Sequence, residues 1–420
     1  MNLKKFTNQS KVWGWGKILT KKVLFAGAYG LENAGDDLPL ILICEKLKEY
    51  APQFLFEFTA LSRHPNLGNE KAYGIKFIKN LEYDTKEESK DKSFKGLNYG
   101  DNKDDLVQVE EEIKNCDLLV LGAGNIFHDK TIDIFRGPIP LFALYVFLAK
   151  LYHKKVMLYG TSVTPLKTSL GKTLSRYIVE NSDIVTLRDE RSKIELQKIL
   201  TKPKKISVFP DSTLGAIKPD EDTINNFLKK EKIPRGGRYI GLALRDLRVV
   251  LTDDETEIVW NQIVNTLNKL KNEFEFVFVP QVTYKEDDDR IIAKELSKRL
   301  DKDVKFHLIK NWDDPRELIG LYSCFDLTLS IRLHGTIFSC IAGTPVIAIN
   351  YMPKVESFME SMELKEYLID FKSIKNDYLL KLINKLLEDK KVSTKIKNTT
   401  CQKKEITNCY PKLAVSLLDE

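Results

Sequence analysis

Short runs of β-branched and aromatic residues alternate along this chain with longer stretches of helical periodicity. The runs predict strands, and the stretches between them predict helices. The strands are predicted within residues 21–30, 53–62, 116–126, 154–165, the first part of 183–192, 238–246, 274–281, 303–309, 325–330 and 345–350. The helices are predicted at 38–50, 139–152, 169–181, 254–272, 286–300, 315–323 and 333–343. This alternation is typical of parallel sheets that are covered by helices.

Prolines and glycines interrupt the pattern between about residues 203 and 237 and predict an interdomain crossing. We therefore predict an α/β protein with two Rossmann-like parallel-sheet domains in a GT-B-like arrangement and a cleft between them. A segment rich in Lys, Asp and Glu, 76–114, is interpreted as an exposed insertion in the first domain. The expected divisions are an N-terminal extension (1–20), an N-terminal α/β domain (21–215), a C-terminal α/β domain (216–370), and C-terminal helices with a tail (371–420).

Composition and charge narrow the class of protein. Of 420 residues, 43% are hydrophobic and 30% are charged, which is typical of a folded globular chain. The net charge of +6 is a small surplus over a long chain and gives little support to nucleic-acid binding. The six cysteines lack C-x-x-C spacing, and no apolar run reaches the ~18 residues that span a membrane. We expect a cytoplasmic protein and leave open a location at the inner face of the membrane.

Two glycine loops follow predicted strands of the first domain. GAYGLENAGDD (27–37) places Asp36 and Asp37 near a helix start, where capping explains one aspartate but not the whole loop. Neither G-x-G-x-x-G nor a P-loop pattern is present, so a carboxylate that accepts a hydroxyl proton is the functional alternative. GAGNIFHD (122–129) allows either a tight turn or close approach of a ligand to the backbone. His128 fits a loop histidine as well as a catalytic one, and the sparse histidines favour no zinc site.

Three loops carry arginine at the carboxyl end of a strand: LRDERS (187–192), ALRDLR (243–248) and SIRLHGT (330–336). For Arg245 a structural ion pair and a functional role are weighted equally. In SIRLHGT the strand is expected to end at Ser330 and the helix to begin near Leu333. The helix start then predicts an anion site, at which Arg332 and His334 project.

These loops resemble the motifs of one family, the polysaccharide pyruvyl transferases. The match covers about residues 21–370, with departures at Ala123 and Thr164, where the family usually has glycine. The segments that carry it are GAYGLENAGDD (G-x-x-G-x-x-N-x-G-D-[DE]), GAGNIFHD (G-G-G-x-x-x-x-D), VMLYGTSVTPL (G-x-x-x-G-P), LRDERS (R-D-x-x-S) and SIRLHGTIFSCIAGTPVIAINYMPKV (S-x-R-L-H…A-x-G-x-P…Y-x-x-K-V).

The resemblance implies a transfer of the enolpyruvyl unit of phosphoenolpyruvate onto two hydroxyls of one sugar, with release of phosphate. The sugar would belong to a cell-surface polysaccharide or its lipid-linked precursor. It implies no metal and no cofactor, a donor site in the C-terminal domain and an acceptor side in the N-terminal domain. His334 is then the expected general acid, with Asp36 as base and Asp37 as second choice. The expected phosphoenolpyruvate ligands are Arg188, Arg332, Leu333 and Lys354, and the expected acceptor ligands are Asn33, Asp37, Gly122 and Asn125.

Two other functions remain open from the sequence. A GT-B glycosyltransferase that uses a nucleotide sugar would place a diphosphate at the same helix start. It would need an acidic residue further along that helix to bind ribose, and 337–344 (IFSCIAGT) is uncharged. A noncatalytic carbohydrate-binding protein would not need Arg332, His334 and Lys354 together. The family function is therefore the leading hypothesis.

Overall fold

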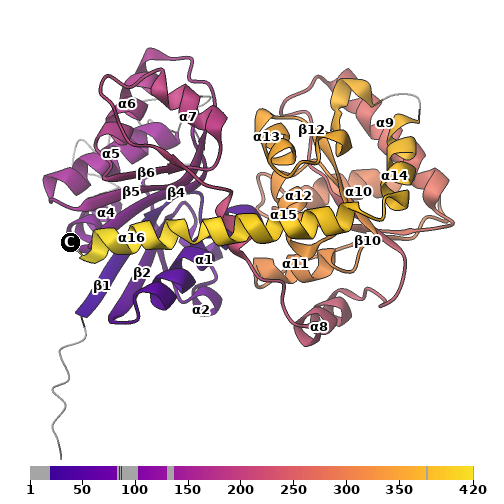
Figure 1. The fold of residues 1–420 in the computed structure, drawn as a ribbon, viewed down its shortest axis with the longest axis horizontal. Coiled ribbons are helices and arrows are strands. Elements are labelled where there is room, and N and C mark those ends of the chain that lie inside the picture. Colours follow the sequence, from indigo (N-terminus) through magenta and orange to yellow (C-terminus); the bar gives the residue numbers. More distant parts are fainter. Residues whose placement is uncertain are drawn as a thin grey trace, which may run out of the picture.

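The computed structural model describes residues 19–82, 85, 87, 103–129, 137–374 and 377–419. In these residues the chain forms two parallel sheets that lie side by side, each flanked by helices (Figure 1). We call the seven-stranded sheet with its helices the first lobe and the six-stranded sheet with its helices the second lobe. The predicted pair of parallel α/β domains is thus confirmed.

The first sheet has the strand order β3-β2-β1-β4-β5-β6-β7, and the second has β10-β9-β8-β11-β12-β13. The first comprises β1 (Leu19–Ala26), β2 (Phe54–Ser62), β3 (Lys76–Lys79), β4 (Leu118–Phe127), β5 (Lys155–Val163), β6 (Ile184–Leu187) and β7 (Ser207–Val208). The second comprises β8 (Tyr239–Ala243), β9 (Glu275–Phe278), β10 (Phe306–Leu308), β11 (Leu327–Ser330), β12 (Val346–Asn350) and β13 (Leu368–Asp370). The order reverses between β1 and β4 and between β8 and β11, so these pairs are the topological switch points at which such sheets bind ligands.

Helices cover both faces of the sheets, which explains why the central strands are apolar throughout rather than alternating. All five residues of β8 and nearly all of β4 and β5 are buried. The first lobe contains α1 (Ala34–Tyr50), α2 (Glu70–Tyr73), α4 (Lys103–Asn115), α5 (Pro138–Leu151), α6 (Ser169–Glu180) and α7 (Glu190–Gln197). From α8 onward the chain forms α8 (Glu221–Glu231), α9 (Asp253–Leu270), α10 (Asp289–Arg299), α11 (Pro315–Tyr322), α12 (Leu333–Ala342), α13 (Pro353–Ser361), α14 (Tyr378–Glu388), α15 (Val392–Thr407) and α16 (Cys409–Asp419).

The interpretation of 76–114 as an exposed insertion is wrong at both ends. Lys76–Lys79 is the edge strand β3, in which Phe77 and Ile78 are buried, and Lys103–Asn115 is α4, whose Val109 and Ile113 enter the core. The charged residues lie on the solvent-facing side of an amphipathic helix, and they masked its apolar stripe. Most of 83–102, like residues 1–18 of the expected N-terminal extension, lies outside the described residues.

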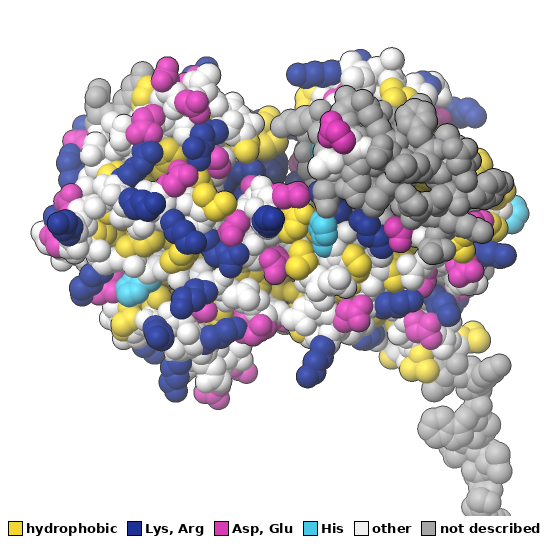
Figure 2. All heavy atoms as spheres, turned by 180° about the vertical axis from the view of Figure 1, so that it is seen from behind, with side chains coloured by type: hydrophobic (Ala, Val, Ile, Leu, Met, Phe, Trp, Pro, Cys, Tyr) yellow, Lys and Arg dark blue, Asp and Glu magenta, His cyan; other side chains and the backbone are white. Residues whose placement is uncertain are grey.

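The surface agrees with the small net charge. On the face shown in Figure 2, basic and acidic side chains are interspersed over both lobes. Among the described helices, none is long and apolar enough to cross a membrane. The apolar helix α5 instead packs against β4 and β5.

The C-terminal helices return to the first lobe. In Figure 1, α15 and α16 run across both lobes as one yellow band, and α16 packs on α1 and β5. Tyr410 fixes this return, because its buried ring meets Tyr159 edge to face at 5.0 Å between centroids. Its hydroxyl lies 3.0 Å from the carbonyl oxygen of Pro210 and donates to it. The end of the chain therefore links the two sheets.

Replacing Tyr410 tests this link. Tyr410→Ala leaves a cavity between α16 and β5 and is expected to cost about 3–5 kcal/mol of local stability. Hydrogen–deuterium exchange should then rise in α16 and β5 while α9 of the second lobe is unchanged. Tyr410→Phe keeps the ring, loses only the hydrogen bonds and should cost about 1 kcal/mol. Equal exchange changes in both lobes would contradict this assignment of the C-terminal helices.

Candidate active site

The two topological switch points face each other across the boundary between the lobes. The loop before α1 pairs with the loop after β9 through a backbone bridge between Asn33 and Val282. Ala34 N donates to Gln281 O at 2.9 Å, and Thr283 N donates to Glu32 O at 3.0 Å. Beside this bridge lies an enclosed cavity of about 80 Å³, lined by Asn33, Asp36, Gly124, Asn125, Arg188, Gln281, Val282, Arg332, Leu333, His334, Tyr351 and Lys354.

The start of α12 forms one wall of this cavity. β11 ends at Ser330 and the helix begins at Leu333, as predicted. Arg332 occupies the N-cap position, and no side chain caps the first amides of the helix. Uncapped amides and the positive end of the helix dipole favour an anion at this position.

Arg332 does not project into the cavity as a free cation. Its Nε donates to Asp289 at 3.0 Å, its Nη1 donates to Asp287 at 3.0 Å, and the guanidinium is almost wholly buried. Asp289 also accepts the backbone amides of Gln281 and Val282, at 2.9 and 3.1 Å. Carboxylates thus occupy most of the donor groups of Arg332, which still lines the cavity, and its role as a ligand of the donor stays a prediction.

Arg188 is also paired, but in the first lobe. Its Nη1 lies 3.0 Å from Asp211, and its Nη2 donates to Ser162 at 2.8 Å. The pair is almost inaccessible to solvent, so the arginine is held rigidly at the cavity wall. A fixed cation of this kind orients an anion without losing much side-chain entropy.

Lys354 differs from the two arginines in its ion pairing. It lies in the first turn of α13, and no carboxylate of the described residues lies within ion-pair distance of its ammonium group. Its Nζ instead lies 6.0 Å from the centre of the Tyr351 ring. Of the three predicted cationic ligands, Lys354 is thus the one that forms no ion pair with a described carboxylate, although it interacts electrostatically with Asp36 across the cavity.

His334 lies against the first lobe. A Cβ at Gly35 would fall 1.9 Å from its Nδ1, so only glycine fits at that position of α1. Burial lowers the pKa of His334 to about 4, with Arg188 and Lys354 adding to the effect against the opposing charge of Asp211. In the structure the imidazole of His334 is therefore neutral near neutral pH, whereas the sequence predicted a histidine that holds a proton there.

Asp36 faces the cavity from the first turn of α1. Burial raises its pKa to about 6, although Lys354 and Arg188 oppose the shift. Its Oδ2 accepts a hydrogen bond from Asn33 Nδ2 at 2.6 Å. The Oδ1 lies 3.1 Å from the position of a Cβ at Gly124, where φ is +102°, so glycine is required there. Asp36 is therefore ionised near neutral pH, close enough to its pKa to exchange a proton.

Two residues predicted to bind the acceptor lie elsewhere. Asp37 is buried, accepts the backbone amide of Gly30 at 2.7 Å and has a pKa raised to about 7 by burial. Gly122 packs against β5, where a Cβ would lie 2.5 Å from the Tyr159 carbonyl oxygen. Neither lines the cavity, so both serve the geometry of their loops.

Two amide oxygens at the cavity, Asn125 Oδ1 and Gln281 Oε1, have no hydrogen-bond partner within the described part of the chain. Each side chain is fixed by its amide nitrogen, which donates to Thr164 Oγ1 in one case and Tyr322 Oη in the other, both at 2.9 Å. Buried acceptors without partners indicate a ligand that brings hydroxyl or N–H donors. Asn125 was predicted, whereas Gln281 was not.

The residues missed by sequence reasoning are Gln281, Tyr351, Asp211, Asp287 and Asp289. The loops 281–285 and 350–354 follow predicted strands, so the carboxyl-end rule pointed to Gln281 and Tyr351. The aspartates carried no local signal, because each pairs with an arginine distant in the sequence.

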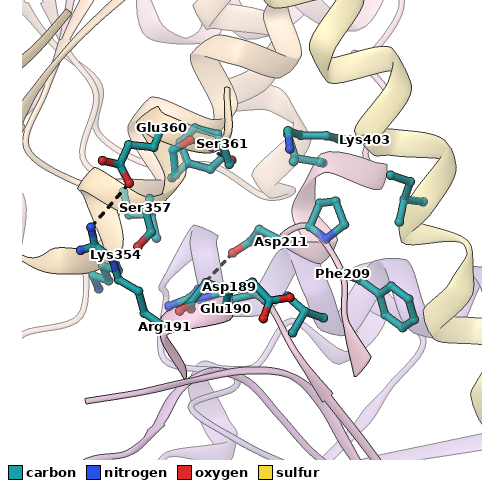
Figure 3. A pocket seen from close by; sticks show the side chains of 17 residues that line it. Asp189, Glu190, Arg191, Phe209, Asp211, Lys354, Ser357, Glu360, Ser361 and Lys403 are labelled. Atoms are coloured by element: carbon teal, nitrogen blue, oxygen red, sulfur yellow. Dashed lines mark hydrogen bonds and ion pairs between the residues drawn. The ribbon is translucent and has the colours of Figure 1, made fainter. Parts of the chain in front are cut away.

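Two larger pockets adjoin the cavity. One of about 400 Å³ lies between α7, α13 and α15 and shares Arg188, Leu333 and Lys354 with it. In Figure 3, Lys354 lies at the left of this pocket, Asp211 near the middle and Lys403 at the upper right. The other, of about 240 Å³, is in the first lobe and shares Asn125. The small cavity is therefore placed beside space for a larger ligand.

Solved structures with a similar fold include glycosyltransferases and UDP-GlcNAc 2-epimerases. A glycosyltransferase from Rickettsia africae matches with a TM-score of 0.58 and 16% identity, covering 95% of this chain and 98% of that one. HepE from Anabaena, solved with UDP-glucose, matches with a TM-score of 0.56 and 14% identity over 94% and 99%. A UDP-GlcNAc 2-epimerase from Methanocaldococcus jannaschii matches with 0.56 and 14% over 88% and 93%. At these identities the likeness defines the fold alone, and the GT-B-like prediction is confirmed.

The family is defined by the sequence. The model of the polysaccharide pyruvyl transferases matches residues 33–352, which include every predicted site residue except Lys354. The amylovoran biosynthesis protein AmsJ of Erwinia amylovora is 24% identical over 294 residues, which is 68% of each chain. The chain belongs to the polysaccharide pyruvyl transferase family, and the expected membership is confirmed.

The contact between Gly35 and His334 can be tested by a double-mutant cycle. Gly35→Ala should destabilise the protein by about 1–3 kcal/mol, because the added methyl overlaps the imidazole. In a His334→Ala background the overlap is absent, and alanine should be neutral or stabilise α1 by about 0.5–1 kcal/mol. The measurement is urea unfolding of all four proteins. The same cost in both backgrounds would show that Gly35 is required for another reason.

Proposed function

We propose that the protein transfers the enolpyruvyl group of phosphoenolpyruvate onto two hydroxyls of one sugar, forming a pyruvate ketal and releasing phosphate. The acceptor is a sugar of a cell-surface polysaccharide or of its lipid-linked precursor. Family membership supports the reaction class. The observation that carries the proposal is one cavity lined by a carboxylate with a raised pKa (Asp36), by His334 and by Lys354. The uncapped start of α12 lies in the same cavity.

The donor brings a carboxylate and a phosphate, and the cavity offers matching groups. Lys354 and the amide of Leu333 bind one anionic group, and Arg188 orients the other from the first lobe. Arg332 acts mainly by holding the start of α12 through Asp289. Donor binding therefore uses groups from both lobes.

Proton transfer is assigned to Asp36 and His334. Asp36, ionised near neutral pH, takes the proton of the attacking sugar hydroxyl. His334 becomes an acid only after the donor binds, because the anionic donor offsets the nearby cations and raises the pKa of the imidazole. The protonated imidazole then protonates the methylene carbon, which makes the central carbon electrophilic.

The acceptor needs more room than the small cavity supplies. Asn125 and Gln281 present their amide oxygens to its hydroxyls, and Asn33 holds Asp36 in place. A sugar ring reaches these groups through one of the adjoining pockets. The orientation of the sugar ring in that pocket determines which pair of hydroxyls reacts.

The alternative of a nucleotide-sugar glycosyltransferase is favoured by one observation, the complex of the HepE relative in fold with UDP-glucose. In this chain, residues 337–340 of α12 are apolar or hydroxylic and buried, and 337–344 contain no acid to bind a ribose. UDP-glucose is therefore the right competitor ligand for the donor assay.

Phosphate release tests the donor site. The purified protein should release phosphate from phosphoenolpyruvate only when a suitable glycoside is present. His334→Ala should abolish release, and Arg332→Ala should do so by loosening the start of α12. Lys354→Met should raise KM for phosphoenolpyruvate about 10- to 100-fold, the value of a lost charged hydrogen bond. Lys372→Met, outside the cavity, is the control. Full turnover by Arg332→Ala and His334→Ala, or saturable binding of UDP-glucose without binding of phosphoenolpyruvate, would refute the assignment.

The pKa of His334 tests the proton donor. Phosphoenolpyruvate should raise this pKa from about 4 toward neutrality, because its negative charges offset Arg188 and Lys354. Binding then takes up a proton, so affinity should weaken as pH rises through the pKa of the complex. Nitrogen-15 NMR of labelled imidazoles, assigned with His334→Gln, measures the pKa with and without phosphoenolpyruvate. Titrations of phosphoenolpyruvate at several pH values measure the affinity. An unchanged pKa at saturating donor would exclude His334 as the acid.

A further inference from the structure

Ketal formation moves more protons than two residues account for. Both sugar hydroxyls lose a proton, the methylene carbon gains one, and the phosphate that leaves gains the other. Two C–O bonds form at the central carbon, and the bond to the phosphate oxygen breaks with its electron pair. Under the proposed function, Asp36 accepts one proton and His334 gives one. One further donation and one further acceptance have no assigned group.

Tyr351 lies in the same cavity as His334 and Lys354. β12 ends at Asn350 and α13 begins at Pro353, so Tyr351 stands in the turn between them. β12 pairs in parallel with β11, and this pairing places the turn beside the start of α12. The sequence motif Y-x-x-K-V includes this tyrosine, to which the reaction above gives no role.

Cations surround the phenol. The Arg245 guanidinium lies 5.5 Å from the ring centre, and its Nη1 approaches the hydroxyl oxygen at 3.5 Å. Lys354 Nζ lies 6.0 Å from the ring centre on the α13 side. A hydroxyl in such surroundings gives up a proton easily and faces the groups that would hold a phosphate.

Two buried polar atoms near Tyr351, Arg245 Nε and Asn350 Oδ1, have no hydrogen-bond partner among the residues that the structure describes. Arg245 is otherwise held by Asp287 at 3.2 Å. Neither residue lines the cavity itself, but Arg245 contacts the Tyr351 hydroxyl and Asn350 precedes it in the chain, so polar groups remain available next to the phenol. Because Lys354 and the uncapped start of α12 line the same cavity as the phenol, an anion bound by them would lie near the hydroxyl of Tyr351.

We propose that Tyr351 is a second proton carrier of this reaction. Its hydroxyl donates to the bridging oxygen of the departing phosphate, and the phenolate then takes the proton of the second sugar hydroxyl as that oxygen attacks the central carbon. The phenol is restored, and the proton count of the whole reaction closes. Arg245 is a positioning residue that holds and polarises the phenol.

The acidity of the phenol agrees with this role. Burial acts to raise the pKa of Tyr351, but Lys354, Arg245 and Arg332 outweigh burial and lower it to about 8. By contrast, burial raises the pKa of the enclosed tyrosines Tyr322 and Tyr410. Among the described residues, the charged and titratable groups around Tyr351 are these three cations and Asp287 on the loop before α10, together with His334 on α12 and, from the first lobe, Asp36 and Arg188. The free enzyme thus holds a phenol at neutral pH that becomes a phenolate above about pH 8.

Tyr351→Phe removes the hydroxyl and keeps the ring. It should lower kcat about 10²- to 10³-fold and leave the affinity for phosphoenolpyruvate, measured by calorimetry, within about twofold, because the phenol acts after the donor is bound. The assay uses aryl hexopyranosides that present free diols. Rapid-quench phosphorus NMR should show a phosphorylated tetrahedral adduct accumulating in the variant. Tyr367→Phe, a hydroxyl of the second lobe bonded to Asp389 away from the cavity, is the matched control.

The pH profile separates proton transfer from packing. In the wild type, kcat/KM should fall above about pH 8 as the phenol ionises. Tyr351→Phe should lack this limb, and Arg245→Gln should move it to higher pH, because a cation that favours the phenolate is lost. An unchanged kcat, an unchanged alkaline limb, or a parallel loss of donor binding in Tyr351→Phe would overturn the proposal. No phosphate release by the wild type with any glycoside would instead overturn the pyruvyl transfer itself.

Discussion

The buried ion pair between Arg332 and Asp289 is the interaction on which the site depends. Asp289 also binds the amides of Gln281 and Val282, and Gln281 O accepts the amide of Ala34 from the other lobe. The next residue of α1, Gly35, contacts the ring of His334, two positions beyond Arg332. The contacts thus form a closed circuit through both lobes. Removing one partner of such a buried pair typically costs about 3–5 kcal/mol, because the other charge stays uncompensated.

This circuit also sets the electrostatics of the cavity. Arg332 and Arg188 are compensated by Asp289 and Asp211, so the site avoids the cost of several buried, unpaired cations. Burial and the remaining charges of the cavity shift the pKa values of its titratable groups. The pKa of Asp36 is raised, and those of His334 and Tyr351 are lowered. A site in this state is poised to change its protonation when a multiply charged anion enters.

The sequence predicted most of the strands and the loops that form the site. The features that it did not predict have physical causes. The strand pattern and the carboxyl-end rule located the loops of both switch points. Asp36 and Asp37 were not separable by sequence alone, because neighbouring residues on a helix point about 100° apart, so one faces the cavity and the other binds Gly30. The carboxylates that pair with Arg332 lie more than forty residues away, so no local pattern reveals them. The solvent-facing charges of α4 hid its apolar stripe.

The helix start at Leu333 does not by itself specify a chemistry, since GT-B-like folds use such a terminus for the phosphates of nucleotide sugars as well. What differs is the surroundings. A nucleotide site needs space and a polar partner along the helix, whereas α12 is buried against the core beyond its first turn. A pyruvyl transfer needs groups that exchange protons within reach of one small anion. The cavity meets the requirement of a pyruvyl transfer. A carboxylate, an imidazole and a phenol line a volume of about 80 Å³, together with a lysine that forms no ion pair with a described carboxylate. The proposed reaction therefore rests on the side chains around the helix start rather than on the helix itself.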